Sequence, residues 1–301
     1  MNKPVDRNHQ AEAAAAPSLP LAILWMSGAV LSFLLLAISG RELSDTMTIY
    51  QVVFFRTWAA LAIVLLLVWR TGFHKVATKR LPLHFLRNIL HLGGISLWFL
   101  GISLLPLSMV FSLEFTTPIW TTLLAAPLLG QRLTPVRLLS VLFGFAGVLI
   151  ILRPGLGIID PAALFVLGAA VFYAVAFICN ISLSKTEKPL TIIFYMGIIQ
   201  AAIAAVPVAW FWVWPQWNDA IWIFLVGLCG VTSHYCFTRA MILADAVIVL
   251  PVDYLRLPLA LVIGAFIYAE TLDPILVLGA GVIIAGNIIN IRHEARRRRN
   301  H

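Results

Sequence analysis

Residues 162–183, AALFVLGAAVFYAVAFICNISL, contain no charged side chain. An α-helix of about 20 mostly apolar residues is long enough to cross the hydrocarbon core of a bilayer, which is about 30 Å thick. A transmembrane β-strand would instead alternate apolar and polar residues over about 10 positions, and this stretch does not alternate. The stretch therefore predicts a membrane-spanning helix.

Nine further stretches of the same kind fill most of the chain. They are Leu21–Ser39, Ile49–Trp69, Leu83–Leu104, Leu107–Leu129, Val136–Leu152, Leu190–Trp214, Ala220–Leu243, Ala246–Ala269 and Ile275–Ile291. The sequence thus predicts an all-α polytopic membrane protein with ten transmembrane helices. Apolar residues make up 61% of the chain and charged residues 11%, against about 45–50% and about 25% in soluble domains. This composition excludes a soluble enzyme, a nucleic-acid-binding domain and a disordered chain.

The distribution of positive charge predicts the orientation in the membrane. If the N-terminus is cytoplasmic, 16 of the 21 Lys and Arg residues fall on the cytoplasmic side and only Arg41 and Arg153 fall outside. The other three, Arg56, Arg87 and Arg256, lie within the spans. Basic residues in short loops favour the cytoplasm. We therefore expect both termini to be cytoplasmic, with residues 1–20 as a tail. Residues 293–301 would form a basic tail that lies against the anionic inner leaflet.

The two halves of the chain can be aligned with each other. The segment Gln131-Arg-Leu-Thr-Pro135 matches Glu270-Thr-Leu-Asp-Pro274 without gaps, each of them between the last two helices of its half. We call this alignment the repeat register. Five helices per half is an odd number, so the second half enters the membrane from the opposite side. Inverted repeats around a site near the membrane midplane recur in secondary transporters. The sequence predicts two inverted five-helix repeats, residues 21–153 and 161–292.

An ordered set of short motifs accompanies this pattern. The motifs are Phe54-Phe-Arg56, Leu86-Arg87, Thr117-Pro118, Leu133-x-Pro135, Ala146-Gly147, Leu257-Pro258, Ala269-Glu270 and Ala285-Gly286. With these motifs the chain, from about Leu21 to Ile291, resembles the EamA branch of the drug/metabolite transporter superfamily. The family usually has Glu where Gln131 stands. The resemblance implies a multi-pass carrier of the bacterial inner membrane, in a family that very often exports amino acids or their derivatives.

Charged side chains within the spans are the first candidates for substrate binding. A charge at the middle of a bilayer costs at least about 2.5–3.5 kcal/mol unless it is paired or faces water. With the neighbouring histidines and aromatic residues, the candidates are Arg56, Arg87, His91, Trp98, Glu114, His234, Tyr235, Asp253, Tyr254 and Arg256. Several of them fall roughly 12–17 Å from a membrane face at about 1.5 Å per residue, which suggests one central cavity. The alternative for each is a structural role, as a salt bridge or in helix packing.

The spacing of these candidates predicts which of them lie together. Arg87, His91 and Trp98 recur at helical intervals and share one face of the third span. Glu114 falls on Asp253 in the repeat register, which the loops alone define. We therefore expect one carboxylate from each repeat at the same depth.

The function expected from the sequence is secondary active transport by alternating access. Arginine binds carboxylates in bidentate geometry, so we expect export of a zwitterionic or carboxylate-bearing metabolite, such as an amino acid or an opine-type metallophore. Glu114 or Asp253 could exchange protons as the coupling ion. The alternatives are uptake of a vitamin or nucleoside-derived solute and, less favoured, a membrane scaffold. The sequence leaves open whether the protein forms a homodimer. We expect no enzymatic activity, cofactor, metal or nucleic-acid partner, because the sequence contains no HExxH, GxSxG, phosphate-loop or metal-ligand motif.

Overall fold

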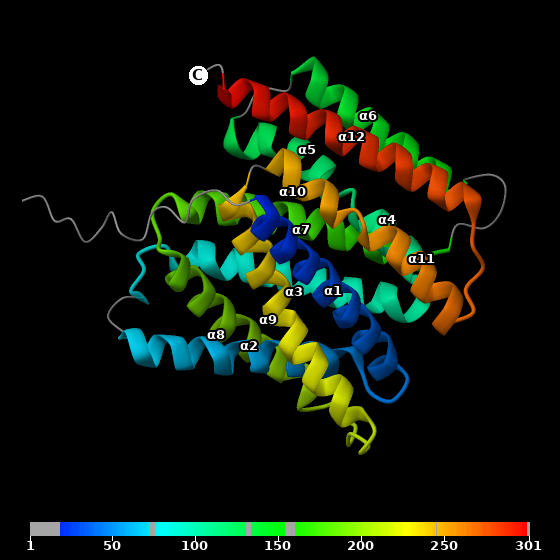
Figure 1. Ribbon diagram of the computed structural model, residues 1–301. Coiled ribbons are helices and arrows are strands. Elements are labelled where there is room, and N and C mark those ends of the chain that lie inside the picture. The colour runs from blue at the N-terminus through cyan, green and yellow to red at the C-terminus, as the bar shows by residue number, and fades with distance from the viewer. Residues whose placement is uncertain (1–18, 73–75, 131–133, 154–159, 245, 300–301) are drawn as a thin grey trace, which may run out of the picture.

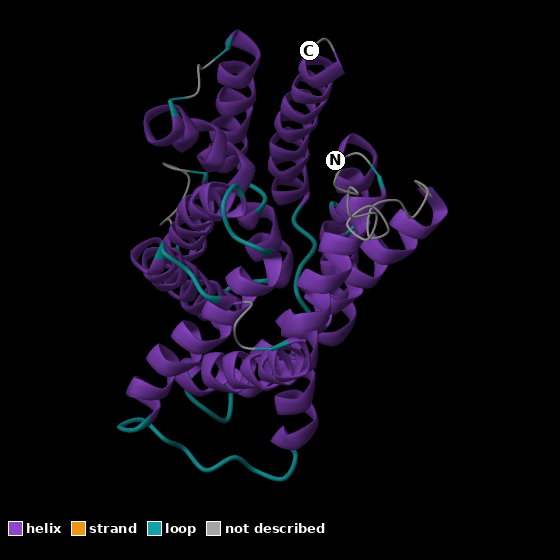
Figure 2. Cartoon of the chain, turned by 90° about the vertical axis from the view of Figure 1, so that its left-hand side faces the viewer, coloured by secondary structure: helices purple, strands orange, loops and turns teal. Residues whose placement is uncertain are grey.

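The computed structural model describes residues 19–72, 76–130, 134–153, 160–244 and 246–299. Within these residues the chain forms twelve helices and no strand (Figure 2). The helices are α1 Leu19–Ser44, α2 Ile49–Thr71, α3 Leu81–Leu104, α4 Leu107–Glu114, α5 Thr117–Leu129, α6 Pro135–Leu152, α7 Ala162–Ser184, α8 Pro189–Val208, α9 Asp219–Leu243, α10 Ala246–Asp253, α11 Arg256–Ile267 and α12 Pro274–Arg299. They make ten apolar spans long enough to cross a membrane, so the predicted all-α polytopic fold is confirmed.

Two of the ten spans are broken, which the sequence analysis did not foresee. The fourth span consists of α4 and α5, and the ninth of α10 and α11. The first helix of each pair ends on a carboxylate, Glu114 or Asp253, so the two breaks occupy equivalent positions. Pro118 and Pro258 lie in the first turns of the second helices, where proline is tolerated because those N–H groups have no partner within the helix. The two prolines thus follow the breaks rather than lying in the middle of continuous helices.

The two repeats interlock rather than forming separate halves. The helix α1 packs along α9, and its repeat equivalent α7 packs along α3. The helices α2 and α8 pack on each other, as do α6 and α12, which run side by side in Figure 1. Each contact therefore either has an equivalent or joins two equivalent helices, as an inverted repeat requires.

The crossing of α6 and α12 shows this equivalence at the level of atoms. A Cβ atom at Gly147 would lie 2.6 Å from the carbonyl oxygen of Gly279, and one at Gly286 would lie 2.9 Å from that of Ser140. Gly147 falls on Gly286 in the repeat register, and Ser140 falls on Gly279. The same close backbone approach therefore occurs twice, which small residues permit between membrane helices.

The two helix breaks meet each other. The rings of Phe115 and Tyr254, which also correspond in the repeat register, pack edge to face with their centroids 5.0 Å apart. The Asn287 side chain of α12 donates from Nδ2 to the Phe115 carbonyl oxygen at 2.8 Å. This bond satisfies a carbonyl at the break, and the contact of the two breaks brings Glu114 and Asp253 to the same place.

The ends of the chain agree only in part with the expected tails. The N-terminal tail lies mostly outside the described residues, and so does Gln131. At the C-terminus α12 continues to Arg299, so the backbone of residues 293–299 extends the last helix.

Candidate functional site

Arg256 joins one carboxylate from each repeat. Its Nη1 lies 3.2 Å from Oε1 of Glu114, and its Nη2 lies 2.7 Å from Oδ2 of Asp253. The other oxygen of Glu114 accepts from the indole Nε1 of Trp98 at 2.8 Å. The remaining oxygen of Asp253, Oδ1, is buried and has no hydrogen-bond partner among the described residues. We call Glu114, Asp253 and Arg256 the acid group, because two carboxylates and one guanidinium leave one net negative charge when all are ionised.

Aromatic rings surround the guanidinium of Arg256. Its central carbon lies 4.7 Å from the ring centroid of Phe33, 5.0 Å from that of Phe115 and 5.4 Å from that of Phe111. Such cation–π contacts strengthen when the cation is shielded from water, and Arg256 is buried. None of the three phenylalanines was a candidate from sequence, because a phenylalanine in an apolar span resembles any other lipid-facing or packing residue.

A second group of polar side chains carries positive charge. It consists of Arg56 on α2, Arg87 and His91 on α3, and His234 on α9, which we call the basic group. Nη2 of Arg56 lies 3.4 Å from Nε2 of His234, and the rings of His91 and His234 lie 6.1 Å apart. Among the described residues neither arginine has a carboxylate within ion-pair distance, and the Nε atoms of both are buried without a partner. Burying an unpaired charge is costly, so this arrangement favours an anionic ligand.

Two buried amides support the basic group, and the sequence analysis missed both. Asn88 on α3 accepts at Oδ1 from Nη1 of Arg87 at 2.8 Å and from Nε2 of Gln200 at 3.0 Å. The same Nε2 of Gln200, on α8, lies 3.1 Å from Nδ1 of His91. Both amides are almost fully buried, at 0% and 2% exposed. Their signal in the sequence is an amide within an apolar span, which needs a buried partner.

Aromatic side chains separate the two groups. Phe33 contacts both groups: its ring centroid lies 5.6 Å from that of His234 and 4.7 Å from the central guanidinium carbon of Arg256. Tyr173 lies 5.6 Å from His91, ring to ring, and interacts electrostatically with one charge of each group. His234 is exposed in the middle of its span, although its ring contacts side chains of α1, α2 and α3.

The structure brings together nine of the ten candidates from the sequence. The acid group and its neighbours include Trp98 and Tyr254, and the basic group holds Arg56, Arg87 and both histidines. Tyr235 joins neither group: its ring packs on Trp25 of α1, and the residue is 55% exposed. A substrate-binding role for these side chains stays a prediction.

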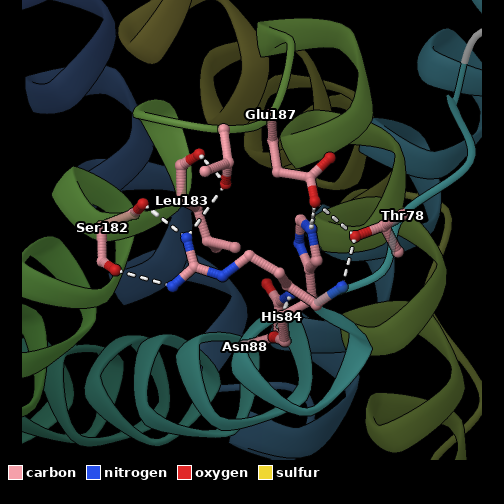
Figure 3. Close-up of polar contacts among 8 residues, drawn as sticks. Thr78, His84, Asn88, Ser182, Leu183 and Glu187 are labelled. Carbon is pink, nitrogen blue, oxygen red and sulfur yellow. Dashed lines mark hydrogen bonds and ion pairs between the residues drawn. The ribbon is translucent and has the colours of Figure 1, made fainter.

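A separate polar cluster ties two loops together at the face where α1 begins (Figure 3). Arg80 donates from Nη1 to the carbonyl oxygen of Ser182 at 2.7 Å and from Nη2 to its Oγ at 2.8 Å. Thr78 donates to Oε1 of Glu187 at 2.5 Å, and the buried His84 ring lies 4.0 Å from the same oxygen. These bonds join the α2–α3 loop to the end of α7.

The opposite face is held by a second polar cluster, around Glu270. Its carboxylate pairs with Arg41 of α1 and accepts from the backbone N–H of Leu107 at 3.2 Å, in the first turn of α4. The Tyr268 hydroxyl donates to Oε1 of Glu42 at 2.8 Å. Burial and this hydrogen bond raise the pKa of Tyr268 well above its ordinary value, so the hydroxyl remains a donor. The cluster joins the end of α1, the start of α4 and the end of α11.

Proteins of known activity resemble the chain over most of its length. The S-adenosylmethionine uptake transporter of Rickettsia bellii is 26% identical over 257 residues, 85% of this chain and 88% of that protein. The riboflavin transporter of Rhizobium johnstonii is 28% identical over 297 residues, 98% of both chains. A solved crystal structure superposes with a TM-score of 0.62 at 17% identity, covering 93% of this chain and 99% of that one. This last likeness concerns the fold.

The family itself is visible twice within the chain. The sequence model of the EamA-like transporter family matches residues 20–153 and, separately, residues 160–292. The two matches correspond to the two sets of helices that interlock in the structure, and together they cover nearly all of the described residues. This multi-pass membrane protein therefore belongs to the EamA-like transporter family.

Proposed function

We propose that this transporter takes up a small solute that carries both a carboxylate and a positive charge, of the S-adenosylmethionine type. The observation that supports this is the pair of oppositely charged groups within the spans. Arg56 and Arg87 lack a carboxylate partner among the described residues, whereas the acid group has an excess of one carboxylate. A substrate carboxylate would bind the two arginines, and an ammonium or sulfonium would face the acid group and its aromatic rings.

The proposed direction is uptake rather than the export expected from the sequence. The relative from Rickettsia bellii is named as an uptake transporter, and export of amino-acid metabolites has no support among these relatives. Uptake of a nucleoside-derived or vitamin solute was the alternative. S-adenosylmethionine is both nucleoside-derived and a zwitterionic amino acid, so the expected substrate chemistry carries over to this proposal.

Riboflavin is the second candidate, because the Rhizobium relative is named as its transporter. Riboflavin carries no carboxylate and no cation, so it would leave Arg56 and Arg87 without a counter-charge. The rings of Phe33, Phe111 and Phe115, which could stack on a flavin, already contact Arg256. The charges of the site therefore favour the zwitterion.

Uptake of radiolabelled S-adenosylmethionine into proteoliposomes tests the proposal. We expect saturable uptake that unlabelled S-adenosylmethionine inhibits and that excess riboflavin leaves unchanged. Arg56→Gln should weaken uptake, whereas the control Arg70→Gln, at the exposed end of the same helix, should not. Uptake of riboflavin without uptake of S-adenosylmethionine would replace the proposal by the second candidate. Efflux without uptake in intact cells would reverse the direction.

A further inference from the structure

The orientation of the Asn88 side-chain amide is fixed by a hydrogen-bond partner at its nitrogen and by another at its oxygen. Its Nδ2 lies 2.8 Å from the backbone carbonyl oxygen of His84, which only accepts (Figure 3). Its Oδ1 lies 2.8 Å from Nη1 of Arg87, which only donates. Either partner alone would orient the amide, and both require the same orientation. Oδ1 of Asn88 is therefore an acceptor.

This polarity passes through Gln200 to His91. The Gln200 atom that lies 3.0 Å from Oδ1 of Asn88 faces an acceptor, so it is the amide nitrogen Nε2. The same nitrogen lies 3.1 Å from Nδ1 of His91. An amide nitrogen donates and does not accept, so Nδ1 of His91 is the acceptor and carries no proton. His91 is then neutral, with its proton on Nε2.

His234 has its tautomer fixed in the same way. Its Nε2 lies 3.4 Å from Nη2 of Arg56, and a guanidinium nitrogen has only hydrogens to offer. Nε2 of His234 must therefore accept, which leaves the proton on Nδ1. A second proton on either histidine would place an N–H against another donor and add a cation beside Arg56 and Arg87.

We propose that Asn88 and Gln200 are positioning residues that hold His91 as its neutral Nε2–H tautomer, so that the basic group offers only hydrogen-bond donors. An acceptor-only group such as a carboxylate then meets complementary atoms, whereas an amine or amide N–H group meets donors and is rejected. The inference rests on the proposed function, because it names which end of the zwitterion this group binds. The fixed tautomer of His91 adds discrimination between a carboxylate and an N–H group, which the charge of the arginines alone does not give.

The tautomer can be measured without any solute. In the full chain with ¹⁵N-labelled histidine, His91→Asn assigns the His91 resonances in the NMR spectrum. We expect an acceptor-type Nδ1 and a protonated Nε2 at neutral pH. In Gln200→Glu the carboxylate can only accept, so His91 should acquire a proton on Nδ1. Gln200→Met, which neither donates nor accepts, should leave a mixture of tautomers. A protonated Nδ1 in the unsubstituted protein would overturn the proposal.

Transport of a matched pair of solutes tests the consequence for specificity. The pair is S-adenosylmethionine and its decarboxylated analogue, which lacks only the carboxylate. We expect Gln200→Met, which removes the donor to His91 without adding a charge, to raise KM for S-adenosylmethionine by up to about tenfold, because His91 no longer keeps its proton on Nε2 and one hydrogen bond to the charged carboxylate is weakened; KM for the analogue should be unchanged. Equal losses for both solutes would indicate a structural role for Gln200 and contradict the proposal. If the unsubstituted protein carries neither solute, the proposed function fails, and the NMR result still decides the role of Asn88 and Gln200.

Discussion

Two buried arginines in the site, Arg56 and Arg256, differ in what balances their charge. Arg256 is held by a carboxylate from each repeat and by three aromatic rings. Arg56 is 3% exposed, and its side-chain hydrogen bond is to the ring of His234. Removing one partner of a buried ion pair leaves the other charge uncompensated, whereas removing a charge that has no partner relieves a cost. The two residues should therefore respond in opposite ways to neutral substitution.

For Arg56→Gln we expect an unchanged or higher melting temperature together with weaker transport. The protein no longer buries an unpaired guanidinium, but the substrate loses a charge-assisted hydrogen bond, so KM for S-adenosylmethionine should rise about tenfold or more. Thermal unfolding in detergent and uptake into proteoliposomes measure the two effects. A lower melting temperature with unchanged KM would mean that Arg56 is structural.

For Arg256→Gln we expect a loss of about 3–5 kcal/mol of stability, because Glu114 and the buried Asp253 then lose their shared cation within the spans. Removing one of these charges as well, in Arg256→Gln with Glu114→Gln, should restore part of the loss. The measurement is the unfolding free energy of the single and double variants in the same detergent. A double variant no more stable than the single one would show that Glu114 and Arg256 are not coupled.

At the scale of the elements, glycines set how closely α6 and α12 approach. A Cβ at Gly147 or Gly286 would meet backbone oxygens at 2.6 and 2.9 Å, and backbone cannot move aside as a side-chain tip can. We expect Gly147→Ala and Gly286→Ala each to destabilise the protein by about 1–3 kcal/mol. Gly281 on α12 is the matched control, since a Cβ there meets nothing within 4 Å. Gly281→Ala should be neutral or stabilising by up to about 1 kcal/mol in thermal unfolding. Equal losses of stability at all three sites would contradict the idea that Gly147 and Gly286 are needed for the close approach of α6 and α12.

The sequence predicted the ten spans because length and apolar composition are all that a bilayer requires of a helix. It also paired Glu114 with Asp253, because the loops on which the repeat was aligned keep the register of the spans. The helix breaks escaped prediction because each span is continuous in length and apolar composition, and a carboxylate or a proline within a span does not by itself show that the helix is interrupted there. Phe33 and Gln200 escaped for another reason: their roles depend on partners that are far away in the sequence and that only the fold brings near.

At the scale of the whole molecule, neither repeat contains a complete charge group. Glu114 comes from the first repeat, and Asp253 and Arg256 from the second. In the basic group Arg56 belongs to the first repeat and its partner His234 to the second. A movement of one repeat against the other would therefore change the contacts of both groups at once. Alternating access needs such coupling, together with a closure at each face that can be released alone.

The two end clusters are the candidates for these closures. Glu270→Gln keeps the shape of the side chain but removes the ion pair with Arg41, so it should open the face where α1 ends. Arg80→Gln removes the bonds to Ser182 and should open the face where α1 begins. The readout is the labelling rate of Tyr173→Cys, between the charge groups, by an impermeant thiol reagent after the three native cysteines are replaced by alanine.

The positive charge of the loops predicts which vesicles report each opening. If the termini are cytoplasmic, inverted vesicles expose the Arg80 face to the reagent, and right-side-out vesicles expose the Glu270 face. Arg80→Gln should then speed labelling in inverted vesicles alone, and Glu270→Gln in right-side-out vesicles alone. If Arg80→Gln speeds labelling only in right-side-out vesicles and Glu270→Gln only in inverted vesicles, the predicted orientation is wrong, but each cluster still closes one face. Faster labelling from both sides in either variant would mean that the clusters stabilise the fold without controlling access, because a closure acts on its own face.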